Sequence, residues 1–256
     1  MYPRVNLLGV GVSAVNLRQA VDSIEGWVKD RVRRYVCLAP AHSLMDCWRD
    51  PHLRSIFNRS AMVPPDGMSL VWFLRLRGHS QVERVYGPDL MLAMAKRSAE
   101  GGYRHFLYGG APGVAEGLAE RLLKKFPAGL QVVGTFSPPF SALSTMEEKV
   151  VVERINLLAP DIVWVGLGSS KQERWMADHR NVIEAPVLIG VGAAFDFVSG
   201  RKPQASPWMQ RAGLEWLFRL ATEPRRLWPR YRQYPLFVLL VLAQALGLRH
   251  YPIVED

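Results

Sequence analysis

Runs of apolar residues alternate along the chain with segments in which apolar residues recur every three or four positions. From about Tyr103 onward, each apolar run leads into a turn and then into a helical pattern. Strands that alternate with helices favour a mostly parallel sheet. We therefore expect an α/β fold, with a Rossmann-like mostly parallel sheet flanked by helices. The expected strands are 105–108, 130–133, 162–166 and 187–191, and the expected helices are 114–126, 146–158 and 172–180.

The first hundred residues carry the same two patterns. Short apolar runs predict two strands, the second of them buried, and helical spacing predicts helices between and after them. The last of these helices begins at Gly87, because Pro88 and Asp89 suit a first helical turn. The expected strands are 6–11 and 34–38, and the other expected helices are 17–29 and 43–48.

A predicted α/β domain, residues 1–204, is followed by a helical basic and apolar appendage, residues 205–256. Five arginines and one glutamate lie within 219–232, so the appendage begins with a patch that attracts anions. The fourteen-residue stretch 235–248 is almost wholly apolar but shorter than the roughly 20 residues with which a helix spans a bilayer. We expect that the appendage does not cross a membrane.

The composition excludes several classes of protein. Hydrophobic residues make up 49% of the 256, which is enough for a folded core. Only Cys37 and Cys47 occur, too few for a disulfide framework or a thiolate metal site, and the N-terminus lacks a signal-peptide pattern. No His-x-x-x-His, paired-cysteine or Asp-x-Asp pattern is present. We expect a protein of the reducing cytoplasm that uses no metal and no other cofactor.

Three glycine-bearing turns follow predicted strands, at 109–113, 166–173 and 190–196. The carboxyl ends of parallel strands share one edge of the sheet, where such folds bind ligands. Glycines let a ligand approach the backbone, and the following helix offers N–H groups to phosphate. Ordinary strand-to-helix geometry is the alternative for any one turn. Together the turns favour a nucleotide or sugar-phosphate ligand. The candidate glycines are Gly109, Gly110, Gly113, Gly168 and Gly192.

Three polar residues near these patterns are candidate ligands. Lys171 and Gln172 begin a predicted helix and suit a phosphate and sugar hydroxyls, against the alternative of a solvated first turn. Arg84 precedes another predicted helix and is a candidate for binding an anion, although an isolated arginine is more often a surface residue.

Asp66 stands between the stiff dipeptide Pro64-Pro65 and Gly67, which permits a sharp turn. A rigidly held carboxylate suits a general base. The alternative is a helix N-cap, since Asp is a preferred cap and residues 69–74 have a helical pattern.

The motifs stand in a specific order along the chain. They are Pro65-Asp66-Gly67; Arg84 with Gly87-Pro88-Asp89-Leu90; Leu107-Tyr108-Gly109-Gly110 with Pro112-Gly113-Val114-Ala115-Glu116; Gly166-Leu167-Gly168 with Lys171-Gln172-Glu173-Arg174-Trp175; Phe195-Asp196 with Ser199-Gly200; and Gly213-Leu214-Glu215-Trp216 through Arg219-Leu220 and Glu223-Pro224. In this order, over roughly residues 6–231, the chain resembles the bacterial WecG/TagA/CpsF glycosyltransferases, glycosyltransferase family 26.

The resemblance implies transfer of a sugar from a UDP-sugar donor to a polyprenyl-diphosphate-sugar acceptor, with inversion and without a metal. It implies that Asp66 is the general base and that Gln172 contacts the donor sugar. Without a divalent ion, the departing diphosphate needs cationic side chains and helix N–H groups. Arg84 and the basic patch, including Arg219 and Arg225, are the candidates.

The chain departs from the family pattern at two places, and the first of them affects the substrate. Many members carry an Asn and a Glu where this chain reads Ala39-Pro40-Ala41-His42-Ser43, so His42 or Ser43 is expected to take over the positioning of substrate. The sugar then differs from the N-acetylmannosamine of the best-known members. The second departure is Ser169-Ser170, where Pro commonly precedes Lys.

Members of the family carry a C-terminal appendage associated with membranes, which implies a peripheral protein on the inner face of the cytoplasmic membrane. Arginines and interfacial aromatic residues of 219–237 fit this expectation. The alternative is that the apolar stretch packs on the domain or on another subunit of a homo-oligomer.

Two other functional classes compete with the enzyme. The basic balance is compatible with nucleic-acid binding, but no recognition motif occurs and we expect no nucleic-acid partner. A non-catalytic scaffold of a polysaccharide assembly complex would keep the fold and the appendage without needing the carboxylate of Asp66.

Overall fold

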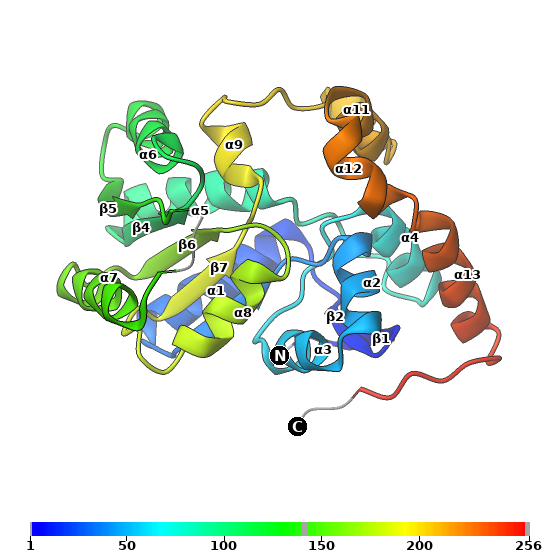
Figure 1. The fold of residues 1–256 in the computed structure, drawn as a ribbon. Coiled ribbons are helices and arrows are strands. Elements are labelled where there is room, and N and C mark those ends of the chain that lie inside the picture. Colours follow the sequence, from blue (N-terminus) through cyan, green and yellow to red (C-terminus); the bar gives the residue numbers. More distant parts are fainter. Residues whose placement is uncertain (1, 140–142, 254–256) are drawn as a thin grey trace. The chain divides into compact units, whose positions relative to one another are not determined.

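The computed structural model describes residues 2–139 and 143–253, and these group into two compact units (Figure 1). Unit 1 is formed by the described residues of the segments Met1–Asn16, Leu38–Tyr86 and Gln204–Asp256. Unit 2 is formed by the described residues of Leu17–Cys37 and Gly87–Pro203. Residues from Gln204 onward thus group with two earlier segments of the chain, and the separate role expected for residues 205–256 stays a prediction.

Unit 2 contains a five-stranded parallel sheet with the strand order β3-β7-β6-β4-β5. Its centre is apolar, because residues 106–107, 162–165 and 187–189 are buried. This confirms the expected α/β fold and its parallel sheet. The strands are β3 (Arg34–Cys37), β4 (Arg104–Gly109), β5 (Gln131–Phe136), β6 (Ile162–Gly166) and β7 (Val187–Gly190).

Helices cover both faces of this sheet. Helix α1 packs against α5, and α9 packs against both α5 and α6. Figure 1 shows α6 and α9 above the sheet and α7 and α8 below it. All of the helices expected in this unit are confirmed, with bounds that differ by one residue at most. The helices are α1 (Leu17–Lys29), α5 (Gly87–Gly101), α6 (Val114–Lys125), α7 (Thr145–Leu157), α8 (Lys171–His179) and the short α9 (Ala194–Val198).

The N-terminal strand is a hairpin rather than the single strand expected over 6–11. Strand β1 (Arg4–Leu7) pairs antiparallel with β2 (Val10–Ser13). Leu8 and Gly9 join them with φ values of 55° and 85°. A two-residue hairpin turn of this kind needs positive φ at both positions, and Leu at the first of them gives no turn signal in the sequence.

Unit 1 is otherwise helical. The expected helix 43–48 is confirmed as the longer α2, whereas α3 was not expected. Helix α3 begins directly after Asp50, whose side chain accepts a hydrogen bond from the backbone N–H of Leu53 at 3.0 Å, and it has Pro51 in its first turn. The helices are α2 (Ala41–Arg49), α3 (Pro51–Arg59), α4 (Met68–Leu76), α10 (Pro207–Arg211), α11 (Glu215–Thr222), α12 (Pro224–Tyr231) and α13 (Tyr234–Ala245).

Helix α13 lies against the N-terminal hairpin through its one strongly polar residue. The side-chain amide of Gln244 donates to the carbonyl of Asn6 at 3.1 Å, and its oxygen accepts from the N–H of Leu8 at 2.9 Å. Phe237 and Leu240 are buried. Across the described residues, none of the helices has the length and apolar character needed to traverse a bilayer.

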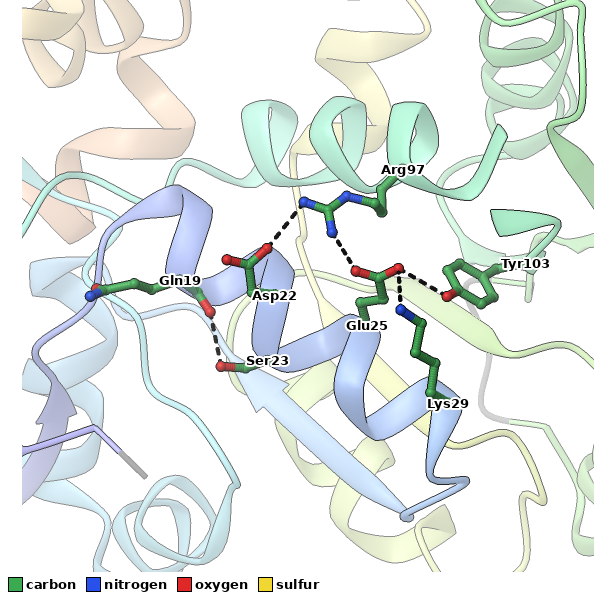
Figure 2. Close-up of polar contacts among 7 residues, drawn as sticks. All are labelled: Gln19, Asp22, Ser23, Glu25, Lys29, Arg97 and Tyr103. Atoms are coloured by element: carbon green, nitrogen blue, oxygen red, sulfur yellow. Dashed lines mark hydrogen bonds and ion pairs between the residues drawn. The ribbon is translucent and has the colours of Figure 1, made fainter. Parts of the chain in front are cut away.

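A polar network ties α1 to α5 in unit 2 (Figure 2). Arg97 on α5 pairs with Asp22 at 3.1 Å and with Glu25, both on α1. Glu25 also accepts a hydrogen bond from the Tyr103 hydroxyl at 3.0 Å and pairs with Lys29 at 3.0 Å. Burial raises the pKa of Glu25, but the hydrogen bonds from Lys29, Tyr103 and Arg97 outweigh it and lower that pKa below its ordinary value.

Replacing Glu25 by Gln removes the shared charge of this network. We expect Glu25→Gln to lower the free energy of unfolding at pH 7 by about 1 kcal/mol. Because the pKa of Glu25 is lowered in the folded state, its contribution is present above the ordinary glutamate pKa and is lost as the pH falls through the lowered value. Urea denaturation at a series of pH values measures both effects. Glu120→Gln, at an exposed position of α6, is the control and should change neither.

Candidate functional site

The backbone around Asp66 is held on both sides. The Asp66 N–H donates to the carbonyl of Ala39 at 3.1 Å, and the N–H of Ala39 donates to the carbonyl of Pro64 at 2.9 Å. On the other side, the N–H of Val85 donates to the carbonyl of Pro65 at 2.8 Å. The two prolines before Asp66 thus lie in a segment that is hydrogen-bonded on one side to Ala39 and on the other to Val85. These contacts, with the fixed φ of proline, hold the backbone of Asp66 in one direction.

Asp66 is not the cap of the helix that follows it. Helix α4 begins at Met68, and its N-cap is Gly67, in extended geometry and without a side-chain cap hydrogen bond. The carboxylate lies one position earlier and faces a guanidinium instead. The N-cap interpretation of Asp66 is therefore wrong, because Gly67 takes the cap position.

The guanidinium of Arg84 contacts two carboxylates. Its Nη2 lies 2.6 Å from Oε2 of Glu215, on α11, and 3.5 Å from Oδ1 of Asp66. Its Nε donates to the backbone carbonyl of Asp66 at 3.0 Å. The side chains of Glu215, Arg84 and Asp66 are 9%, 16% and 21% exposed. Two acids share one cation in a mostly buried place, so the three side chains are strongly coupled.

The ring of Tyr86 completes this group. Arg84 lies over that ring, with its Cζ 4.0 Å from the ring centroid. Burial lowers the pKa of Arg84, but Asp66 and Glu215 outweigh it and raise that pKa, so the guanidinium stays charged. The pKa of Tyr86 is raised by burial and by the charges of Glu215 and Asp66, so its hydroxyl stays protonated.

The sequence pattern indicated no partner for Asp66 and no role for Glu215 or Tyr86. The predicted site residues Asp66 and Arg84 are brought together here, 18 positions apart in the chain. Glu215 was visible only as part of the motif Gly213-Leu214-Glu215-Trp216. An acidic residue among the arginines and apolar residues of that region was the one available signal.

His42 and Arg219 lie in a second group of unit 1. His42 is half-buried in the first turn of α2, and its pKa is lowered to about 3 by burial and by the charges of Arg230 and Arg219. The imidazole is therefore neutral near pH 7 and offers one donor and one acceptor. Arg225 is exposed on α12 and, as far as the described chain extends, forms no hydrogen bond or ion pair.

Aromatic side chains from α11 to α13 adjoin these arginines. The rings of Tyr231 and Tyr234 lie 5.1 Å apart, and Trp216 contacts both. The pKa of Tyr234 is raised by burial first and by Tyr231, whereas Arg219 lowers it and Asp66 raises it. Tyr234 thus lies within the electrostatic reach of both Asp66 and Arg219.

The three glycine-bearing turns meet at one edge of the sheet in unit 2, as expected. They follow β4, β6 and β7, which are neighbours in the sheet. Gly109 pairs with Gly166, and the N–H of Gly110 donates to the Gly166 carbonyl at 3.0 Å. The N–H of Gly192 donates to Val165 at 3.4 Å. The candidate glycines all have positive φ, with values of 131° (Gly109), 77° (Gly110), 80° (Gly113), 85° (Gly168) and 50° (Gly192).

Gln172 is buried at this edge, in the first turn of α8. Its Nε2 donates to Oε1 of the buried Glu173 at 2.9 Å. Its Oε1 is buried too, and within the described ranges it has no hydrogen-bond partner. A Cβ added at Gly192 would lie 3.4 Å from this oxygen, so the glycine keeps a side chain away from it. The amide oxygen can accept a hydrogen bond from a ligand, whereas Lys171 beside it is exposed.

In residues 2–139 and 143–253, no three or more His, Cys, Asp or Glu side chains form a group that could hold a metal ion.

Known proteins match most of the chain. The model of a family described as "Glycosyl transferase WecG/TagA/CpsF family" matches residues 5–251. A similar protein of Bacillus spizizenii is 29% identical over 77% of this chain and 74% of its own length. One of Bacillus subtilis is 27% identical over 90% of this chain and 87% of its own length. Both are named N-acetylglucosaminyldiphosphoundecaprenol N-acetyl-beta-D-mannosaminyltransferase.

The turn after β4 requires a glycine. With φ of 131°, a Cβ at Gly109 would lie 2.6 Å from the carbonyl carbon of Gly166. We expect Gly109→Ala to destabilise the protein by more than about 1 kcal/mol. Gly117→Ala is the matched control, because Gly117 lies in α6 and its added Cβ meets nothing within 4 Å. This control should stabilise by up to about 1 kcal/mol. Thermal unfolding of both variants measures the difference, and equal unfolding temperatures would contradict the assignment.

Proposed function

Because the chain belongs to the glycosyl transferase WecG/TagA/CpsF family, we propose that it transfers a hexose or N-acetylhexosamine from a UDP-sugar to a polyprenyl-diphosphate-linked sugar. The product would enter the synthesis of a bacterial cell-surface polysaccharide. The names of the two Bacillus relatives support an acceptor that carries N-acetylglucosamine on undecaprenyl diphosphate. The observation that carries the proposal is the fixed carboxylate of Asp66 beside Arg84 and Glu215.

Asp66 would act as the general base. The acceptor hydroxyl gives its proton to the Asp66 carboxylate while its oxygen attacks the anomeric carbon. The bond from that carbon to the UDP oxygen breaks on the opposite face, and UDP leaves with the electron pair. One attack of this kind inverts the anomeric centre. Asp66 suits the task because its backbone is held by Ala39 and its side chain is one-fifth exposed, so an acceptor can reach it.

Unit 2 would bind the donor. The glycine turns after β4, β6 and β7 admit a ligand close to the backbone at the carboxyl edge of the sheet, where such folds bind nucleotides. The buried amide oxygen of Gln172 would accept a hydrogen bond from a donor-sugar hydroxyl. Lys171 would pair with a phosphate. The glycines proposed to line the donor are Gly109, Gly110, Gly113, Gly168 and Gly192.

The charge that develops on the leaving diphosphate would be balanced by arginines, without a metal. Arg219 and Arg225 are our candidates. Arg84 already contacts two carboxylates, so a diphosphate would have to compete with both of them. We therefore assign Arg84 to the base instead. The neutral imidazole of His42, near Arg219, would position substrate through a hydrogen bond rather than through charge.

The C-terminal helices would hold the protein on the inner face of the cytoplasmic membrane. Helix α13 has Phe237 and Leu240 buried, while Leu239 is 63% exposed and Leu242 and Leu246 are exposed beside it. Exposed arginines and Trp228 lie just before this row. An exposed apolar row next to arginines and an aromatic residue is typical of a helix that lies in the membrane interface.

Replacing Asp66 by Asn keeps the size of the side chain and removes the base. We expect Asp66→Asn to lower turnover about 10²–10⁴-fold, because the acceptor hydroxyl must then lose its proton to water. Binding of UDP, measured by calorimetry, should be unchanged. Turnover is measured as sugar transfer from a UDP-sugar to a short-chain polyprenyl-diphosphate-N-acetylglucosamine.

Asp178→Asn, at an exposed position of α8, is the control and should keep normal turnover. Normal turnover in Asp66→Asn would contradict the base assignment. If the protein were a non-catalytic scaffold, cells that carry Asp66→Asn would still make normal amounts of the polysaccharide.

The membrane proposal depends on the exposed row of α13. We expect Leu239→Glu to weaken binding to phosphatidylglycerol-containing vesicles by about tenfold or more. The reason is that an apolar side chain, which the proposal places in the lipid, is replaced by a negative charge that the anionic lipid repels. Co-sedimentation at several salt concentrations measures this. Leu157→Glu is the control, since Leu157 on α7 is 86% exposed and lies in unit 2. If Leu239→Glu alters the oligomeric mass but not vesicle binding, the row contacts a second copy and the membrane proposal is wrong.

A further inference from the structure

The side chain of Gln172 is seated between glycines at the carboxyl edge of the sheet in unit 2. Gln172 is buried in the first turn of α8. A Cβ added at Gly190 would lie 3.0 Å from its Nε2, and one added at Gly192 would lie 3.4 Å from its Oε1. The end of β7 and the turn after it therefore leave room for this amide because they carry no side chain there.

Glu173 determines which way round this amide lies. The Nε2 of Gln172 donates to Oε1 of Glu173 at 2.9 Å, and both side chains are buried. The first turn of a helix favours an ionised carboxylate, because the N-terminal end of a helix is positive. An ionised carboxylate only accepts hydrogen bonds, so it faces the amide nitrogen rather than the amide oxygen. The oxygen of Gln172 is thereby turned away from Glu173.

The amide oxygen of Gln172 lies beside two of the glycine turns. It is buried, and among the residues that the structure describes it has no hydrogen-bond partner. A Cβ added at Gly192 would lie 3.4 Å from this oxygen and 3.9 Å from the Cα of Gly168, so all three border one place. A buried amide oxygen without a partner is costly unless a ligand supplies a donor. The group that fits this place is therefore an O–H or an N–H.

We propose that Glu173 is a positioning residue, which orients the Gln172 amide so that its oxygen accepts a hydrogen bond from a hydroxyl or acetamido N–H of the donor sugar. The inference rests on the proposed transfer from a UDP-sugar. It adds a task for Glu173 and states which groups of the donor the amide selects. The ionised oxygens of a diphosphate only accept hydrogen bonds, so they do not fit against this oxygen.

A purely structural role for Glu173 leads to a different expectation. If Glu173 only stabilised the start of α8, the effect of its loss would not depend on the residue at position 172. If it acts through the amide, its effect on the donor disappears once the amide is gone. Because the two side chains share a hydrogen bond, a double-mutant cycle measures this dependence directly.

The test is a cycle of Glu173→Met, Gln172→Leu and the double variant, assayed with the UDP-sugar that the wild type transfers fastest. Glu173→Met keeps the length of the side chain and removes the carboxylate that anchors the amide. We expect it to raise KM for the donor about tenfold and to change kcat less than about threefold, because a misdirected amide weakens binding of the sugar. In the Gln172→Leu background it should not raise KM further. Calorimetry should give unchanged binding of UDP itself.

Exchanging the two side chains tests the orientation itself. Gln172→Glu alone sets two carboxylates against each other and should raise KM for the donor. Adding Glu173→Gln supplies an amide nitrogen that can donate to the new carboxylate, whose other oxygen again accepts from the sugar, so KM should return toward the wild-type value. This exchange serves if thermal unfolding shows that Glu173→Met is unfolded. Glu153→Met, at an exposed position of α7, is the control and should change neither KM nor kcat.

The outcomes separate this inference from the proposed function. A KM that Glu173→Met raises in the wild-type background but not in Gln172→Leu supports the positioning role. Effects that multiply in the double variant, or an unchanged KM in folded Glu173→Met, overturn it while the transfer reaction stands. If the wild type transfers no sugar, the proposed function fails instead. The side-chain NH2 signals of Gln172 in 15N-glutamine-labelled protein then decide, because signals that Glu173→Met leaves unmoved overturn the positioning role as well.

Discussion

One guanidinium shared by two carboxylates sets the electrostatics of the candidate site. Arg84 pairs with Glu215 and with Asp66, donates to the backbone carbonyl of Asp66, and lies over the ring of Tyr86. If Arg84 were absent, two mostly buried acids would repel each other. If it were paired with Asp66 alone, that carboxylate would be a poorer base. Residues from three separate motifs of the chain therefore meet at a single cation.

Much of the fold could be predicted from the sequence, since its elements have strong local signals. The glycine turns after β4, β6 and β7 mark the carboxyl ends of parallel strands, and the segments between them have clear helical spacing. The N-terminal hairpin was not predicted because Leu8 has a positive φ, which a leucine in the sequence does not indicate. Helix α3 was missed although Asp50 and Pro51 form an ordinary helix start, because its apolar spacing was not recognised.

Two members of the candidate site were singled out in the sequence, but their contacts were not. Asp66 and Arg84 were each singled out, one by its rigid setting and the other by its place before a helix. Asp66 and Arg84 are 18 positions apart, and Arg84 and Glu215 are about 130 positions apart. No local pattern in the sequence encodes either contact, because both depend on tertiary packing. The neutral state of His42 has the same origin, because it follows from burial and from two arginines of later helices. Family membership indicates the class of reaction, whereas these contacts indicate what individual residues of the site can do.

We propose that this chain inverts an anomeric centre without a metal, with a side-chain carboxylate as the base. The most direct test is to incubate the purified protein with a panel of UDP-sugars and a short polyprenyl-diphosphate-N-acetylglucosamine in the presence of EDTA. The anomeric configuration of the product is then determined by NMR. We predict transfer from at least one donor, with inverted configuration and at a rate that EDTA does not change. A retained configuration, a reaction abolished by EDTA, or no transfer from any donor would contradict the claim.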